Sequence, residues 1–133
     1  MKVFNMTQHK LQLTQIAQAE QMGYEFIDSS VLEELKKQLS NLKGDEDLTA
    51  LSKAVIEASI EADCSLIFPI GSPLFYMIFA TEVAKRPVEL LFSHTLRECI
   101  ETVQADGSVQ KKMVFNHVGY HVFNKGETQY FPL

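Results

Sequence analysis

Short polar stretches follow four apolar segments of this chain, each at a point where a strand is expected to end. They contain Asn5, Thr7 and His9, then Asp28-Ser29-Ser30, then Gly71-Ser72, and last Ser93-His94-Thr95. In open α/β sheets, ligands bind beyond the carboxyl ends of the strands, so these stretches are candidates for one binding edge. Three of the four carry hydroxyl, amide or imidazole groups and no carboxylate, which favours a polar, anionic ligand.

Two histidines in these stretches, His9 and His94, have side chains suited to acid–base chemistry. Imidazole titrates near neutrality, so each could act as an acid, a base or a donor to phosphate. The alternative is that both are plain surface-loop residues. Gly71-Ser72 at a helix N-terminus could offer backbone N–H groups to a phosphate. The alternative for Ser29, Ser30 and Ser72 is helix capping alone.

The other candidate residues carry weaker signals. Arg97, Lys111 and Lys112 give a C-terminal hairpin a cationic side. Either Arg97 closes over a phosphate, or this side is simply a solvated sheet edge. His117 and His121 are expected on one face of the last strand, and we interpret them as structural, because a zinc site needs further ligands. No dinucleotide, Walker or H-E-x-x-H motif is present, so we expect no metal and no cofactor.

Alternating strands and helices are predicted to position these residues. Apolar strands are expected at 3–6, 24–27, 65–70 and 88–92, and helices at 13–22, after Asp28-Ser29-Ser30, at 48–62 and from Pro73 onward. This alternation predicts an α/β fold, Rossmann-like, with a mostly parallel sheet flanked by helices. We expect one domain over residues 1–133.

The C-terminal part predicts an antiparallel β-hairpin. Expected strands at 95–103 and 109–123 flank Asp106-Gly107, a strong hairpin-turn signal. A two-residue turn there would place Glu101 opposite Lys112 and Ile100 opposite Met113. The first of these pairs is an ion pair, which supports the register.

Composition limits the function classes. The chain has 133 residues and a net charge of −5, which argues against a general binder of long nucleic acids. Cys64 and Cys99 are expected to be buried free thiols in a cytoplasmic protein. No secretory signal is seen, and the uncharged run 64–81 is broken by Pro69, Gly71 and Pro73. We therefore expect no membrane partner.

Three segments resemble one family. They are the T-x-H-x-L of Thr7, His9 and Leu11, the Ser93-His94-Thr95 stretch, and RECIETVQADGSVQKKMVFNHVGYHVF. Together they resemble the small stand-alone CRISPR-associated ring nucleases, which are Rossmann-like domains related to the CARF sensors of type III systems. The resemblance implies cleavage of cyclic oligoadenylate, chiefly cyclic tetra-adenylate, which switches off the signal. It also implies a homodimer with the ring across the two-fold axis.

The implied chemistry is metal-independent attack of a ribose 2′-hydroxyl on the adjacent phosphodiester. From their position and chemistry, the expected catalytic residues are His9 or His94 for proton transfer, with Ser93 and Arg97, together with Thr95, orienting the phosphate. The expected ligand-binding residues are Asn5, Thr7, Gly71, Ser72, Thr95, Lys111 and Lys112. One alternative is a sensor or sponge that binds the ring without cutting it. Another is a phosphate-binding structural protein.

Overall fold

The computed structural model describes residues 1–28 and 30–133, with the side chains of Ser30 and Val31 left aside. The helices are α1 (Leu13–Gln21), α2 (Ser30–Ser40), α3 (Leu48–Glu61) and α4 (Pro73–Val83). The strands are β1 (Lys2–Asn5), β2 (Glu25–Ile27), β3 (Leu66–Phe68), β4 (Glu89–Val103), β5 (Val109–Asn124) and β6 (Glu127–Pro132). The capping expected of Ser29 and Ser30 lies outside the described side chains.

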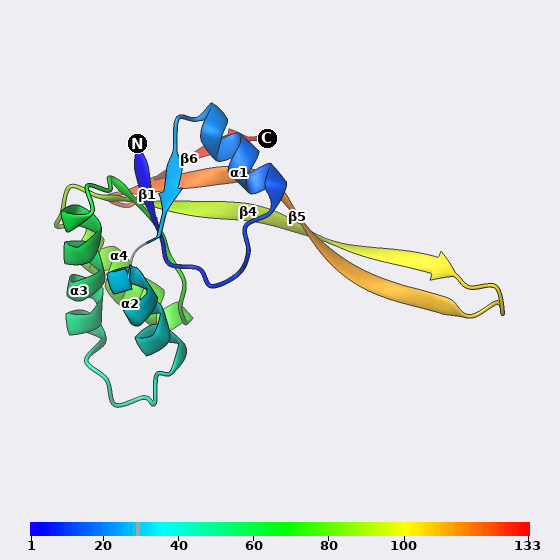
Figure 1. Ribbon diagram of the computed structural model, residues 1–133, viewed down its shortest axis with the longest axis horizontal. Coiled ribbons are helices and arrows are strands. Elements are labelled where there is room, and N and C mark those ends of the chain that lie inside the picture. The colour runs from blue at the N-terminus through cyan, green and yellow to red at the C-terminus, as the bar shows by residue number, and fades with distance from the viewer. Residues whose placement is uncertain (29) are drawn as a thin grey trace.

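The strands form one six-stranded sheet in the order β2-β1-β3-β4-β5-β6. The neighbours from β2 to β4 are parallel, and β5 and β6 are antiparallel to their neighbours. Figure 1 shows α1 on one face of the sheet and α2, α3 and α4 on the other. The expected Rossmann-like α/β fold with a C-terminal hairpin is therefore confirmed. Strand β6 was not predicted.

Each face of the sheet has its own apolar core. On the α1 face, Val3, Leu66 and Leu91 pack with Ala19 and Tyr120. On the other face, the apolar sides of α2, α3 and α4 cover Phe4, Ile67 and Leu90. The rings of Phe75 and Phe79 stack there with their centroids 5.4 Å apart. Alternate residues of β1, β3 and β4 thus enter opposite cores, as expected for strands covered on both sides. No helix of the described residues is long and apolar enough to span a membrane.

Strand β4 is continuous where the sequence analysis expected a turn. Ser93-His94-Thr95 lies inside β4, paired with β5, so the turn predicted there is wrong. No Gly or Pro interrupts residues 89–103, and β5 supplies a ladder partner along this whole length. Strand β4 therefore pairs in parallel with β3 at its start and forms the hairpin with β5 beyond that point.

The hairpin turn is longer than expected. The Gly107 amide donates to the Gln104 carbonyl at 3.0 Å, and the Gln104 amide donates to Ser108 at 2.7 Å. With φ of 85° at Gly107, this is a three-residue loop that ends in a left-handed glycine. The extra residue shifts the register by one, so Glu101 lies opposite Lys111 and Ile100 opposite Lys112. The predicted Glu101–Lys112 and Ile100–Met113 pairs are wrong.

A bulge at Val118 in β5 changes which side chains share a face. His94 pairs with Gly119 but Thr95 pairs with His117, leaving Val118 as the extra residue. The side chains of a bulged strand switch faces at that point. His117 therefore faces α1, while His121 lies on the opposite face, and the expectation that they share one face is wrong.

A row of glutamines docks α1 onto the hairpin strands. Gln18 Oε1 lies 2.6 Å from His117 Nε2, and Gln18 Nε2 donates to the Phe131 carbonyl at 2.7 Å. That second bond fixes the amide orientation, so His117 Nε2 carries the proton and Nδ1 is an acceptor. Ser93 Oγ donates to this Nδ1 at 2.6 Å and accepts from Gln15 Nε2 at 3.1 Å. We name this set the Gln18–His117–Ser93 chain.

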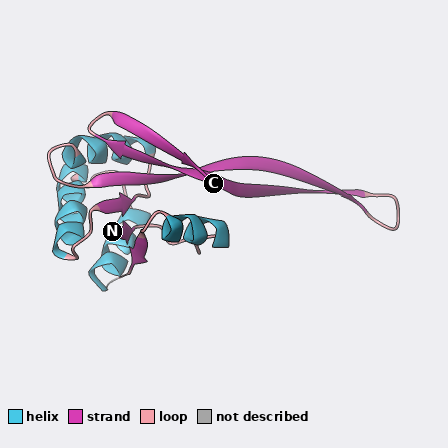
Figure 2. Ribbon diagram, turned by 90° about the horizontal axis from the view of Figure 1, so that it is seen from above, coloured by secondary structure: helices cyan, strands magenta, loops and turns pink. Residues whose placement is uncertain are grey.

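Beyond this chain, β4 and β5 leave the body as a two-stranded arm, which we define as residues 95–117. Figure 2 shows the arm extending well past the helices, with no helix along it. Of the two cysteines, Cys64 is buried as expected. Cys99 lies on the arm and is exposed, so the expectation of burial is wrong for Cys99.

Acidification is expected to destabilise the fold through His117. Burial lowers the pKa of this imidazole from its usual 6.5, so the unfolded chain binds the proton more readily than the folded one. The stability that depends on neutral His117 is present above about pH 6.5 and is lost as the pH falls through the lower folded-state pKa. Urea unfolding at several pH values between 7 and 4 measures this loss.

The variant His117→Gln is expected to lose about 1–3 kcal/mol at pH 7, because Ser93 and Gln18 lose a buried partner. It is also expected to flatten the pH dependence. His121→Gln, on the opposite face of β5, is the matched control and should keep the wild-type profile. An undiminished acid slope in His117→Gln would contradict the assignment.

Candidate functional site

A pocket of about 510 Å³ opens at the carboxyl ends of β1 and β2. Asn5, Thr7 and His9 line it from the end of β1 and the loop that follows. Asp28 and Lys36 line the opposite side, from the end of β2 and from α2. Three residues expected from the sequence therefore meet at one pocket, at the sheet edge where open α/β folds bind ligands.

Hydrogen bonds from its own side chains shape the loop that carries His9. Asn5 is buried, and its Oδ1 accepts from the Thr7 amide at 3.0 Å. Thr7 Oγ1 in turn accepts from the His9 amide at 3.2 Å. Gln8 Nε2 donates to the Lys36 carbonyl at 3.3 Å, which ties the loop to α2. Asn5 and Thr7 thus position the His9 backbone.

Lys36 is the buried cation of the pocket. Its side chain is only 6% exposed, and its Nζ lies 3.2 Å from Glu33 and 3.5 Å from Asp28. A buried ammonium needs such partners, because desolvation without them is costly. Both carboxylates are mostly exposed. The ammonium is therefore fixed in place with its two anionic partners on the solvent side.

The pocket combines groups for acid–base chemistry and for binding anions. His9 supplies an exposed imidazole, Thr7 a hydroxyl, and Lys10 a second cation beside Lys36. Lys10 and Lys36 balance Asp28 and Glu33 in formal charge. Among the described residues no group of three His, Cys, Asp or Glu could hold a metal ion.

A second hollow of about 510 Å³ lies between α2 and α3 and suits an anion less well. Its lining includes the carboxylates of Glu46 and Asp47 and no histidine or cation. Asp47 also caps α3, accepting from the Ala50 amide at 3.0 Å. Two carboxylates at its rim would repel phosphates, so the pocket beside β1 is the better candidate.

Ser93 lies away from this pocket, under α1. Its hydroxyl takes part in the Gln18–His117–Ser93 chain, donating to His117 and accepting from Gln15. Tyr120, its cross-strand neighbour, donates to the Gln15 carbonyl at 2.9 Å. These contacts are those of a residue that anchors α1 to the sheet.

His94 lies on the opposite face of β4 and belongs to an aromatic cluster. Its ring centroid is 5.5 Å from that of His121 and 5.9 Å from that of Tyr130. Edge-to-face packing at these distances is favourable. Within one chain the structure thus places His9 and His94 in different surroundings, and His94 is not among the residues that line the pocket.

Gly71 and Ser72 form the start of α4. Ser72 is the N-cap, and its Oγ accepts from the Phe75 amide at 3.3 Å, so the capping alternative is confirmed for Ser72. Gly71 has φ of 149°, and a Cβ at this position would lie 2.6 Å from the Phe75 ring. Local geometry therefore accounts for both residues, and neither lines the pocket.

The remaining expected site residues lie on the arm or at its root. Thr95 pairs with His117 at the root. The Arg97 guanidinium lies 5.7 Å from the centre of the Phe115 ring, a cation–π contact. Lys111 Nζ lies 3.6 Å from Glu101, and Lys112 is exposed opposite Ile100. Their predicted ligand roles are not supported by any contact with the pocket of the same chain.

Sequence reasoning missed Lys10, Lys36 and the partners of His117. Lys36 follows Leu35 on α2, where a lysine is expected to be solvated, yet its side chain is buried, and Gln8 bonds to its backbone carbonyl. The spacing of Gln12, Gln15 and Gln18 was the one available signal for a polar docking face, because residues three apart share a helix face.

The comparisons with known proteins identify a family. No curated protein and no solved structure matches the chain. The model of the uncharacterized protein MJ1673 family matches residues 1–121, which is most of the chain. The chain therefore belongs to the uncharacterized protein MJ1673 family.

Proposed function

We propose that the pocket beside β1 binds a cyclic oligoadenylate, with cyclic tetra-adenylate as the first candidate, and that the chain opens the ring without a metal. The observation that carries this proposal is the meeting of His9, Thr7, Lys10 and Lys36 at one pocket. An imidazole, a hydroxyl and two ammonium groups at the carboxyl edge of a parallel sheet suit a phosphodiester.

Positioning and charge stabilisation would supply the catalysis. The 2′-hydroxyl oxygen of one ribose attacks the neighbouring phosphorus, and the bond from phosphorus to the 5′-oxygen breaks. The 2′-proton passes to a base and the departing 5′-oxygen takes up a proton. The products are a 2′,3′-cyclic phosphate and a free 5′-hydroxyl. Holding the ribose in line lowers the barrier, and nearby ammonium groups stabilise the charge on phosphate.

In this proposal His9 transfers the proton, because it is the imidazole of the pocket. Lys10 is exposed and free to approach a phosphate, whereas Lys36 is fixed between Asp28 and Glu33. Asn5 and Thr7 position the loop. The roles expected of Ser93, His94, Thr95 and Arg97 remain predictions.

The sequence resemblance to the stand-alone ring nucleases supports the same ligand. It rests most on the hairpin segment 97–123, together with Thr7, His9 and Leu11. We therefore also propose a homodimer, a cytoplasmic location and a role in ending type III CRISPR signalling. These proposals rest on the resemblance and not on the pocket.

One observation favours a second candidate, a binding module that holds the ring without cutting it. Acid–base cleavage commonly uses one group to remove a proton and another to supply one. The lining of the pocket includes one imidazole, that of His9, because His94 packs edge-to-face against His121 and Tyr130 elsewhere. A sensor or sponge would need only the cations and the shaped loop.

The proposed ring opening can be tested with the purified chain. Purified chain mixed with cyclic tetra-adenylate in excess EDTA is expected to give linear products ending in a 2′,3′-cyclic phosphate, identified by chromatography and mass spectrometry. A ring with 2′-O-methyl riboses should stay intact, because its nucleophile is blocked. Tight binding with an unchanged natural ring would support the module, and absence of binding would contradict both candidates.

Replacing His9 tests its proposed role in proton transfer. His9→Ala is expected to slow ring opening about 10²- to 10⁴-fold, as for loss of a general acid or base, while ring affinity changes little. His121→Ala, which removes an imidazole outside the pocket, is the matched control and should keep the wild-type rate. If His94→Ala loses activity while His9→Ala keeps it, the assignment to His9 is wrong.

A further inference from the structure

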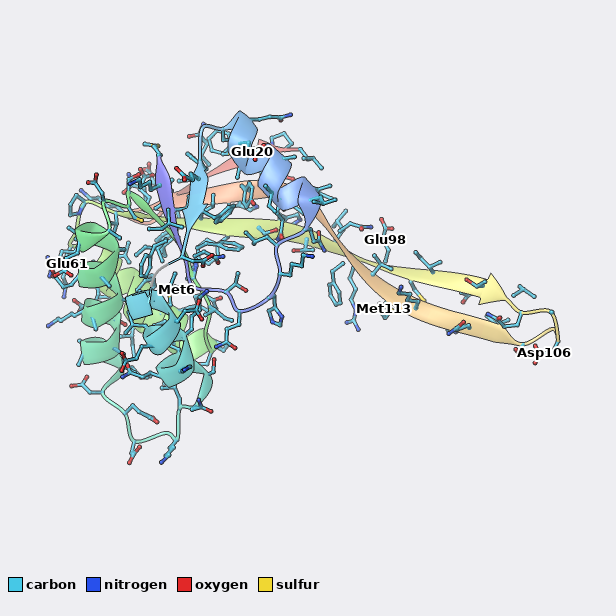
Figure 3. The ribbon with its side chains drawn as sticks, viewed as in Figure 1. Met6, Glu20, Glu61, Glu98, Asp106 and Met113 are labelled. Atoms are coloured by element: carbon cyan, nitrogen blue, oxygen red, sulfur yellow. The ribbon has the colours of Figure 1, made fainter. Side chains whose placement is uncertain are left out.

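The arm leaves a large apolar surface uncovered on a single chain. Figure 3 shows Glu98 and Met113 along it and Asp106 at its tip, far from the helices. Six large apolar side chains on the arm are between 43% and 72% exposed: Leu96, Ile100, Val103, Val109, Met113 and Phe115. A two-stranded ribbon standing alone in water is marginally stable. Such a surface indicates a partner.

The total surface of the chain leads to the same conclusion. A folded monomer of 15.1 kDa is expected to expose about 7,100 Å², whereas this chain exposes 8406 Å². The excess is about 1,300 Å², and each partner in a standard protein interface buries about 800 Å². The chain therefore exposes more extra surface than one partner buries in a standard interface.

Only one edge of the arm is free at its root. Among the described residues, no strand lies beside β4 beyond Leu90 on the side away from β5, since β3 pairs only as far as that residue. On β5 the side chain of Gln12 occupies the corresponding edge. Its Nε2 donates to the Phe115 carbonyl at 2.7 Å, and its Oε1 accepts from the His117 amide at 3.3 Å. The side-chain amide of Gln12 thus makes the hydrogen bonds that a neighbouring strand would otherwise make.

These two bonds also show which β4 residues turn their backbone N–H and C=O groups toward the free edge. In an antiparallel pair, opposite residues both turn their N–H and C=O groups toward each other or both turn them away. Phe115 and His117 turn theirs away from β4, so their partners Arg97 and Thr95 turn theirs away from β5. By alternation Cys99 and Glu101 do the same. Their unpaired donors and acceptors form a template for another strand.

We propose that two copies of this chain pair antiparallel along the free edge of β4, with the two-fold axis at Cys99. Charge selects this register. It places Arg97 opposite Glu101 of the second copy, and the reverse, while Glu98 lies opposite Ile100. If the axis were at residue 98, 97 or 101, then Glu98, Arg97 or Glu101 would lie opposite the same residue of the second copy. Like charges placed directly opposite each other are destabilising.

The proposed pairing also explains the arrangement of side chains on the α1 face of the arm. Cys99 lies opposite Met113 within one chain, so the row across the dimer reads Met113, Cys99, Cys99, Met113. The rows on either side place Phe115 and Arg97 next to Glu101 and Lys111 of the second copy. The central row is apolar, and each flanking row places the Arg97 cation of one copy beside the Glu101 anion of the other, which is self-complementary about a two-fold axis.

This dimer also affects the proposed ring site and in that respect rests on the proposed function. Ser93 of the two copies would lie 12 residues apart along the paired strands, or about 40 Å at about 3.3 Å per residue. A ring of four nucleotides is too small to span that distance. The pocket beside β1 belongs to the same helix-covered body as Ser93, so each copy would hold its own ring, in contrast to the expectation of one ring across the axis. The tip of the second copy would lie beside His94.

Light scattering on the full chain without ligand tests the pairing separately from ring binding. The wild type is expected at about twice the chain mass of 15.1 kDa. Cys99→Pro removes an outward N–H, blocks edge pairing and should give a monomer. Met113→Pro, directly opposite on the other edge of the arm, is the matched control and should stay dimeric. Circular dichroism and Tm confirm that both variants fold.

Charge reversal provides a second test of the pairing. Arg97→Glu and Glu101→Arg are each expected to weaken association at least 10-fold, and the double variant R97E/E101R should restore it. A wild-type monomer would overturn the proposal. So would a dimer that tolerates Cys99→Pro, or a double variant no better than either single one. Capture of a different protein by a monomeric wild type would assign the arm to another partner and overturn it equally.

Discussion

The Gln18–His117–Ser93 chain is the interaction on which the rest of the structure depends. It joins α1 to β4 and β5 through three polar side chains, with Gln18 also held by the Phe131 carbonyl of β6. Buried polar groups are stable only when their hydrogen bonds are satisfied, so the helix can sit in one position only. The loop that carries His9 runs directly into α1, and Gln12 at the start of the helix covers the edge of β5. Helix docking thus positions both the pocket and the root of the arm.

Much of the fold could be predicted from residue patterns, because each pattern reports a local constraint. Continuous apolar runs marked the buried parallel strands, and Asp106-Gly107 marked the hairpin. The misses have non-local causes. The turn expected at Ser93-His94-Thr95 is wrong because β5 pairs with β4 across those residues. The hairpin register is shifted by the three-residue loop at Gly107, and the faces of His117 and His121 are set by the bulge at Val118. None of these has a composition signal.

The residues of the candidate site were likewise predicted only in part. The rule that ligands bind beyond the carboxyl ends of parallel strands located Asn5, Thr7 and His9 correctly at one pocket. It grouped them with Gly71, Ser72 and His94, which the structure uses for helix capping and aromatic packing. It gave no indication of Lys36, which lies on α2, beside the loop that Gln8 ties to that helix. Pocket and arm are separate features of one chain, and the arm-paired dimer would leave one pocket per copy facing its own ligand.

Titration calorimetry with a ring of 2′-O-methyl cyclic tetra-adenylate tests this account most directly, because the ring binds without being cut. The account predicts saturation at one ring per chain, with affinity lowered by removal of Lys10, whose ammonium group lines the pocket. Saturation at one ring per two chains would contradict separate pockets and place the ring across a two-fold axis. Absence of binding heat at any ring concentration would contradict the proposed ligand.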